Sequence, residues 1–156
     1  MKKIFSISIS LFLLACTKAQ VKVGASQFDQ YRSLLVDKNV GLVVNQTSVF
    51  NNTHLVDFLI SEKISITKVF APEHGFRGKA DAGEHVNNQT DTKTGLPIIS
   101  LYGKNKKPSP EQLSGLDIVI FDIQDVGARF YTYISTMHYI MEATAARCND
   151  AEVMMK

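Results

Sequence analysis

The segment from Glu73 to Arg77 places three ionisable side chains within five residues. Glu73, His74 and Arg77 supply a carboxylate, an imidazole and a guanidinium, groups that can exchange protons with a substrate or bind its anionic groups. The alternative is a polar surface turn that happens to contain these residue types. We favour a site, because an apolar run ends at Ala71 and Pro72 cannot continue a hydrogen-bonded ladder. Loops beyond strand ends are where open α/β sheets bind ligands.

A second polar cluster follows the apolar run 116–123 and contains Asp122, Asp125 and Arg129. Hydrolysis of a glycosidic bond commonly uses two carboxyl groups, one protonated and one ionised. Burial near a strand end would raise the pKa of Glu73 and suit it to the protonated role, whereas a nearby arginine would oppose that shift. Asp122 is a candidate for the ionised role. Its alternative role is an Asx turn at the exit of the strand.

Motifs for other chemistries are missing from the sequence. There is no G-x-G-x-x-G or G-x-x-x-x-G-K-[ST] phosphate loop, so we expect no nucleotide cofactor. No H-x-x-x-H or H-E-x-x-H pattern occurs, and we expect no metal site around His74. Two of the 17 basic residues lie in an N-terminal leader, and the remainder equals the 15 acidic residues. A neutral chain gives no reason to expect nucleic acid as a partner.

The first 15 residues have the pattern of a bacterial lipoprotein signal peptide. Lys2 and Lys3 precede an apolar stretch, 4–14, that is too short to span a bilayer. The stretch ends Leu-Leu-Ala-Cys and resembles a lipobox, which predicts cleavage before Cys16 and acylation of that residue. The alternative is an ordinary signal peptide with a chance cysteine. We expect an anchor to a bacterial membrane, on its periplasmic or cell-surface side.

Elements of an α/β sheet are needed to hold the two polar clusters. Apolar runs predict strands at 39–44, 64–71, 96–101 and 116–123. Helical spacing predicts helices at 27–36, 55–59, 110–113 and 130–146. The alternation predicts a Rossmann-like fold with a mostly parallel, doubly wound sheet. The polar groups that follow the strands, including 45–47, should then line one cleft.

Two helices receive more detailed predictions. Asn52 or Thr53 is expected to cap the helix at 55–59. The helix at 130–146 is expected to have two faces. Its predicted apolar stripe comprises Phe130, Ile134, Met137 and Met141, and its predicted polar stripe comprises Tyr131, Ser135, His138 and Glu142. The segment 76–94, between strands, reads as a long irregular loop.

Several ordered motifs together resemble one family. They are APEHGFRG at 71–78, DAGE at 81–84, TGLP at 94–97 with SLYG at 100–103, and FDIQDVGARFYTY at 121–133. The family is that of the NamZ-type exo-β-N-acetylmuramidases, long catalogued as a bacterial domain of unknown function. The resemblance extends over about residues 40–146.

This resemblance implies release of terminal N-acetylmuramic acid from the non-reducing ends of peptidoglycan fragments. It also implies a Rossmann-like domain whose cleft is shared with a second domain, and no cofactor. Glu73 is the implied catalytic residue, with Glu142 as a second one. Residues expected to organise the site or contact the sugar and its lactyl carboxylate are His74, Arg77, Asp122, Asp125 and Arg129.

The expected organisation is a signal peptide at 1–15, an anchor and N-terminal segment at 16–38 and the Rossmann-like domain at 39–146. The segment 147–156 does not resemble the family's continuation, so we expect a truncated copy that lacks the second domain. Two alternative functions remain open. One is a non-catalytic lipoprotein that binds muropeptides, and the other is a nucleotide-binding α/β protein.

Overall fold

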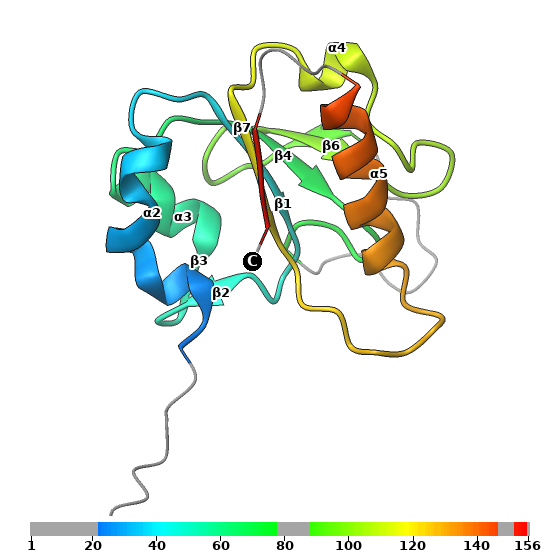
Figure 1. The fold of residues 1–156 in the computed structure, drawn as a ribbon, viewed down its shortest axis with the longest axis horizontal. Coiled ribbons are helices and arrows are strands. Elements are labelled where there is room, and N and C mark those ends of the chain that lie inside the picture. Colours follow the sequence, from blue (N-terminus) through cyan, green and yellow to red (C-terminus); the bar gives the residue numbers. More distant parts are fainter. Residues whose placement is uncertain (1–21, 78–87, 147–151, 156) are drawn as a thin grey trace, which may run out of the picture.

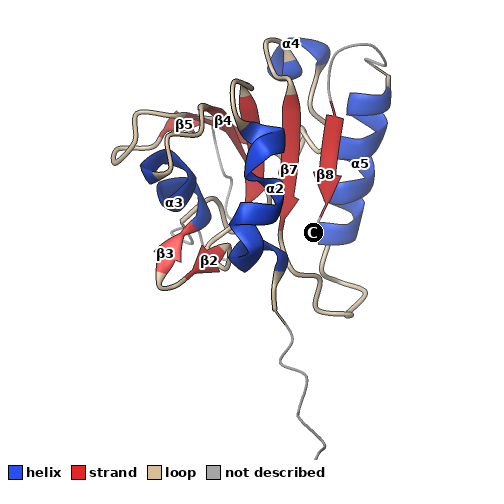
Figure 2. Ribbon diagram, turned by 60° about the vertical axis from the view of Figure 1, so that its left-hand side comes forward, coloured by secondary structure: helices blue, strands red, loops and turns tan. Residues whose placement is uncertain are grey.

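The structure, a computed structural model, describes residues 22–77, 88–146 and 152–155. It consists of a central sheet covered by helices on both faces (Figure 1, Figure 2). The predicted signal peptide, Cys16 and the segment 81–84 lie outside these residues. Within the described ranges, no helix has the length and apolar character that a membrane crossing needs.

The main sheet has six strands in the order β5-β6-β4-β1-β7-β8. Five of them run parallel, and only the short β5 pairs antiparallel with its neighbour β6. The strands are β1 (Val40–Val44), β4 (Ile66–Ala71), β5 (Gln89–Thr90), β6 (Pro97–Ser100), β7 (Ile118–Asp122) and β8 (Glu152–Met155). Taken in chain order, the parallel strands have the doubly wound order 3-2-1-4-5, which confirms the Rossmann-like prediction.

Helices lie on both faces of this sheet (Figure 1). One face carries α2 (Phe28–Leu35), which follows the short helix η1 (Gly24–Gln27), and α3 (Leu55–Ser61). The other carries α4 (Pro110–Leu113) and α5 (Tyr133–Ala145). Every residue of β1 and β7 is buried, which explains their near-continuous apolar sequences.

Alternate residues of β1 belong to two separate cores. Leu42 packs in a cluster with Leu59 of α3, whereas Val43 packs in a cluster with Ile140 of α5. This alternation follows from the two-residue period of a strand. The apolar sequence of β1 therefore holds both helical layers against one sheet.

The cap of α3 differs from the prediction. β2 (Val49–Phe50) and β3 (Thr53–His54) form a hairpin, and both residues of its two-residue turn have positive φ, 48° at Asn51 and 60° at Asn52. Two positive φ values are typical of a type I′ turn, which asparagine tolerates. Because Asn52 is in the turn and Thr53 in the strand, His54 becomes the N-cap, and its side chain accepts the backbone N–H of Val56.

The predicted apolar face of the last long helix was wrong at three of its four residues, since only Met137 packs against the core. Ser135, His138 and Glu142 of the predicted polar face are exposed, as expected. α5 begins at Tyr133, three residues later than expected, and Phe130 lies in the preceding loop with 84% of its surface exposed. Ile134 and Met141, assigned to the apolar stripe, are 59% and 39% exposed. The residues of α5 that are buried are Tyr133, Thr136, Ile140, Ala143 and Thr144. The helix buries this neighbouring face because Ile140 and Ala143 pack in the core cluster that contains Phe121 of β7.

The C-terminal boundary also differs from the expectation. Residues 152–155, placed outside the domain by the sequence analysis, form β8 and pair in parallel with β7, with Ile118 opposite Glu152. A four-residue strand after a polar segment carries too little periodicity for recognition in a single sequence. The sheet therefore extends one strand beyond residue 146.

Candidate active site

A cleft of about 510 Å³ lies at the carboxyl ends of the central strands. Its lining comes from the loops after β1, β4 and β7 and from the start of α5, and comprises Asn45, Gln46, Thr47, His74, Gln124, Val126, Tyr131 and Tyr133. β1 and β7 are neighbours at the point where the strand order reverses. Ligands of doubly wound sheets bind at such a reversal. The structure thus brings three of the predicted strand exits to one cleft.

Glu73 and His74 occupy a tight turn directly after β4. The N–H of Gly75 donates to the carbonyl of Pro72 at 3.0 Å, and His74 adopts a φ of 70°. His74 lines the cleft, and Glu73, beside it, is partly buried. A hydrogen bond to the Glu73 carboxylate raises the pKa of the Tyr102 phenol. Tyr102 follows β6, so a fourth strand exit also contributes to this region.

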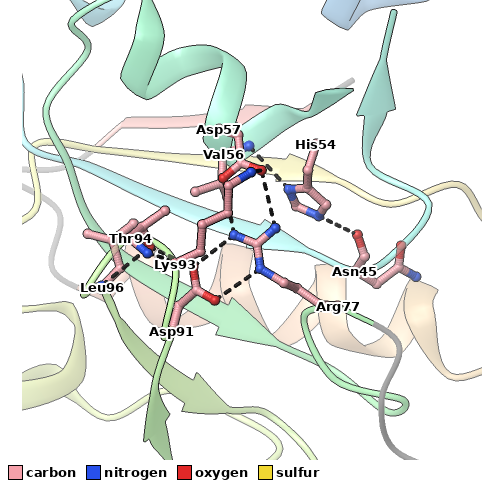
Figure 3. Close-up of polar contacts among 9 residues, drawn as sticks. All are labelled: Asn45, His54, Val56, Asp57, Arg77, Asp91, Lys93, Thr94 and Leu96. Atoms are coloured by element: carbon pink, nitrogen blue, oxygen red, sulfur yellow. Dashed lines mark hydrogen bonds and ion pairs between the residues drawn. The ribbon is translucent and has the colours of Figure 1, made fainter. Parts of the chain in front are cut away.

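Arg77 lies at the centre of a charged cluster (Figure 3). Its Nε and Nη2 atoms contact the two oxygens of Asp91 at 2.9 and 2.8 Å. Its Nη1 and Nη2 atoms contact the two oxygens of Asp57 at 3.2 and 3.1 Å. Lys93 Nζ lies 2.6 Å from Asp57, and the guanidinium carbon lies 4.4 Å from the centre of the Phe76 ring. The Arg77 side chain thus joins the loop after β4 to α3 and to the segment before β6.

The charges of this cluster stabilise one another. The hydrogen bonds that Arg77 donates to Asp91 lower the pKa of Asp91 strongly and raise the pKa of Arg77. Burial alone would raise the pKa of Asp57, but hydrogen bonds from Arg77 and Lys93 outweigh it and lower that pKa. Arg77 was predicted to contact substrate. The structure places its guanidinium between two carboxylates, and Arg77 is not among the residues that line the cleft.

His54 connects this cluster to the cleft (Figure 3). Its Nδ1 accepts the backbone N–H of Val56 at 3.3 Å, and its Nε2 lies 2.9 Å from the carbonyl oxygen of Asn45. An Nδ1 atom that accepts carries no proton, so Nε2 donates to Asn45. Burial lowers the pKa of His54 and favours this neutral form. The ring also packs edge-on against Phe76, with 4.7 Å between the centroids.

Asp122, the last residue of β7, and Asp125, in the loop that follows, have different surroundings. Asp122 is 6% exposed. The pKa of Tyr31, on α2, is raised to about 12, first by burial of the Tyr31 phenol and then by the negative charge of Asp122. Asp125 accepts the N–H of Gly127 at 2.7 Å, which is the Asx turn that the sequence analysis considered for Asp122. It also lines a smaller cavity of about 240 Å³ that shares Gln124 and Tyr133 with the cleft.

Arg129 and Glu142 are both exposed, in different places. Arg129 lies in the loop between β7 and α5, on the side of the cleft. Glu142 lies near the end of α5, nine residues from its start, which corresponds to about 13 Å along the helix axis. Its carboxylate pairs with Lys107 at 3.1 Å. The structure therefore separates Glu142 from Glu73, although the resemblance implies a catalytic role for both.

Sequence reasoning missed Tyr133 and Tyr102 as site residues. Tyr133 was predicted only as part of the helix at 130–146. Both tyrosines follow strands in the sequence, Tyr102 after β6 and Tyr133 after the loop from β7. The same position after a strand was the reason for assigning residues 45–47 to the cleft. Among the described residues, no group of three or more histidine, cysteine, aspartate or glutamate side chains is arranged to hold a metal ion.

Comparison with known proteins identifies the family. Residues 40–155 match the family model described as "Exo-beta-N-acetylmuramidase NamZ, N-terminal". The chain belongs to the NamZ family. It is 50% identical over 131 residues to the peptidoglycan β-N-acetylmuramidase NamZ of Bacillus subtilis strain 168, a match that covers 81% of this chain and 31% of that protein.

Two crystal structures of DUF1343 family proteins from Bacteroides fragilis NCTC 9343 are similar to the structure of this chain. One is 37% identical with a TM-score of 0.74, and the match covers 88% of this chain and 34% of the Bacteroides chain. The other is 41% identical with a TM-score of 0.71, and the match covers 85% of this chain and 33% of the Bacteroides chain. The chain thus spans about a third of the length of these relatives.

Proposed function

We propose that this chain takes part in the hydrolytic release of terminal N-acetylmuramic acid from peptidoglycan fragments, with Glu73 as the acid/base residue. Membership of the NamZ family supports the reaction and the substrate class. The observation that carries the proposal is the position of Glu73, in the turn after β4 beside a cleft at the strand reversal. His74 in the same turn lines that cleft.

In this proposal the protonated carboxyl of Glu73 gives its proton to the glycosidic oxygen as the bond to the muramic acid breaks. The second carboxyl group is assigned to the end of β7, which Asp122 completes and Asp125 follows; Asp125 lines the smaller cavity that adjoins the cleft. Glu142 suits this role less well, because it lies near the far end of α5 and pairs with Lys107. A carboxyl separation of about 5 Å would indicate retention, and 6.5–9.5 Å would indicate inversion.

The test is hydrolysis of a chromogenic β-N-acetylmuramide by the chain and by its Glu73→Gln variant. We expect turnover by the wild type and a loss of at least 100-fold in the variant. Glu62→Gln, at the end of α3 and away from the cleft, is the matched control and should retain turnover. Equal rates for wild type and Glu73→Gln would refute the assignment.

A non-catalytic role in binding muropeptides is the second candidate, favoured by the cleft lining, which includes His74 and two tyrosines but no aspartate or glutamate. The same proteins distinguish the two. Binding of N-acetylmuramic acid without turnover, by wild type and Glu73→Gln alike, would support this candidate.

We also propose that Cys16 is acylated and anchors the chain outside the cytoplasm. The support is the lipobox-like sequence Leu-Leu-Ala-Cys after a basic and apolar leader. Metabolic labelling with an alkyne fatty acid in a bacterial host should label the wild-type chain. The Cys16→Ala variant should remain unlabelled, and label on that variant would contradict the proposal.

A further inference from the structure

Tyr131 is an exposed aromatic residue in the wall of the cleft, a position that no role described above explains. It is 44% exposed and lines the cleft together with Val126, which is 56% exposed. Packing does not account for these side chains, since neither residue belongs to a core cluster. Exposed apolar surface in a concave site is typical of ligand binding. The Tyr131 ring is therefore accessible to a ligand that enters the cleft.

Hydrogen bonds hold the loop that carries Tyr131. Asp125 accepts the N–H of Gly127 at 2.7 Å, and the N–H of Tyr131 donates to the carbonyl of Ala128 at 3.0 Å. Gly127 has a φ of 70°, which glycine adopts without strain. Tyr133, the buried first residue of α5, places its ring centroid 6.0 Å from that of Tyr131. The backbone under Tyr131 is thus in place before a ligand binds, which lowers the cost of ordering it.

Two glutamines add hydrogen-bonding groups to the same cleft. Gln46 follows β1 and Gln124 follows β7, and both are exposed residues of the lining. Neither carboxamide forms a hydrogen bond to another of the described residues. Each carboxamide has N–H donors and a carbonyl acceptor. The two side chains therefore suit neutral groups that donate and accept, such as hydroxyl and acetamido groups.

The lining of the cleft is poor in charge. It contains no lysine, arginine, aspartate or glutamate, and His74 is its only side chain that can become a cation. The guanidinium of Arg77 is engaged by Asp57 and Asp91, and Arg129 is exposed outside the lining. Arginine is the residue that pairs best with a carboxylate. Without a guanidinium or ammonium group, the lining suits an uncharged part of its ligand.

A pyranose ring has the chemistry that matches this cleft. One face of the ring presents C–H groups that pack on an aromatic face, and its edge presents hydroxyl and acetamido groups to amides. We propose that the cleft binds an N-acetylhexosamine ring stacked on Tyr131, and that the lactyl carboxylate of a muramic acid stays outside the lining. This inference rests on the proposed function, which supplies the saccharide class, and it makes Tyr131 a substrate-binding residue.

The experiment is an NMR titration of the full chain with methyl N-acetyl-β-glucosaminide, which lacks the lactyl group, and with N-acetylmuramic acid, which carries it. We expect the two affinities to agree within about threefold, because a solvated carboxylate gains little from exposed cations. Tyr131→Ala should weaken binding of both sugars about fivefold to tenfold, and Tyr131→Phe, which keeps the ring, should restore binding to within about twofold. Phe130→Ala, at the exposed neighbour outside the lining, is the matched control and should bind like the wild type.

Several outcomes would overturn the inference. They are equal affinity of wild type and Tyr131→Ala, equal losses in Tyr131→Ala and Tyr131→Phe, a wild type that binds neither sugar, and a preference of more than about tenfold for N-acetylmuramic acid. The proposed function is judged separately, by the turnover that Glu73→Gln should abolish. Binding that depends on the Tyr131 ring in a chain without turnover would refute catalysis and leave the inference standing.

Discussion

Arg77 and Asp91 form a bidentate ion pair, with Nε–Oδ1 and Nη2–Oδ2 distances of 2.9 and 2.8 Å. Arg77 is four residues from Glu73, so this pair ties the turn that carries Glu73 to the segment before β6. Asp57 holds the other side of the guanidinium and adds a tie to α3. The arginine of the motif therefore helps to hold the loop, and the histidine of the motif lines the cleft.

Replacing Arg77 should destabilise the fold. Arg77→Ala leaves Asp57 and Asp91, which are 13% and 5% exposed at their side chains, without their shared cation. Removing one partner of a buried pair costs about 3 kcal/mol or more of unfolding free energy. Urea denaturation measures the change, and Arg129→Ala, at an exposed loop position, should change it by no more than about 0.5 kcal/mol. Equal stability of the two variants would contradict the role given to Arg77.

Stability should also fall at mildly acidic pH because of His54. Its folded-state pKa is lowered, so the stability that its neutral form contributes is fully present above the unfolded pKa of about 6.5. That contribution is lost as the pH falls from about 6.5 through the folded pKa, because the unfolded state then binds the proton more readily. Chemical denaturation between pH 7.5 and 5 should show this decline.

The control for this pH dependence is a histidine elsewhere in the described chain. His54→Gln should reduce the decline between pH 7.5 and 5, and His138→Gln, at an exposed position on α5, should preserve it. An NMR titration that gives His54 a pKa at or above 6.5 would contradict the prediction.

Asp91 should govern stability at lower pH. Its folded-state pKa is lowered, first of all by the hydrogen bond from Arg77. Its contribution is therefore present above the unfolded pKa of about 3.9 and is lost as the pH falls below that value. The wild type should lose unfolding free energy steeply between about pH 4 and 2, and Asp91→Asn should be less stable at pH 7 with a shallower slope. An unchanged slope would argue against the ion pair.

A methyl group at Gly41 should strain the core. A Cβ atom there would lie 2.8 Å from Leu116 Cδ1 and 3.3 Å from Phe70 Cε2. Gly41 is the second residue of β1 and pairs with β4 on one side and β7 on the other, so Gly41→Ala should cost about 1–3 kcal/mol of unfolding free energy. Adding Leu116→Val should recover part of this loss by making room. If the double variant loses more unfolding free energy than the losses of the two single variants added together, the steric explanation is contradicted.

Much of the fold follows from local sequence. The buried strands β1 and β7 appear as continuous apolar runs because both faces of each are covered. The helix predicted at 110–113 is α4, and the structure adds a capping box at Ser109. The polar residues after the strands could be assigned to one cleft because parallel strands all end at the same edge.

The tertiary structure alone decided how the polar residues of the motifs are used. Arg77 pairs with carboxylates 20 and 14 residues away, and His54 bonds to a carbonyl nine residues away, across the fold. α5 starts at Tyr133, three residues after the expected position; Tyr133 lines the cleft, and Phe130, in the preceding loop, is exposed. Strand and helix patterns reflect forces between near neighbours in sequence. The partner of a charge or hydroxyl depends on the path of distant loops, which no local period records.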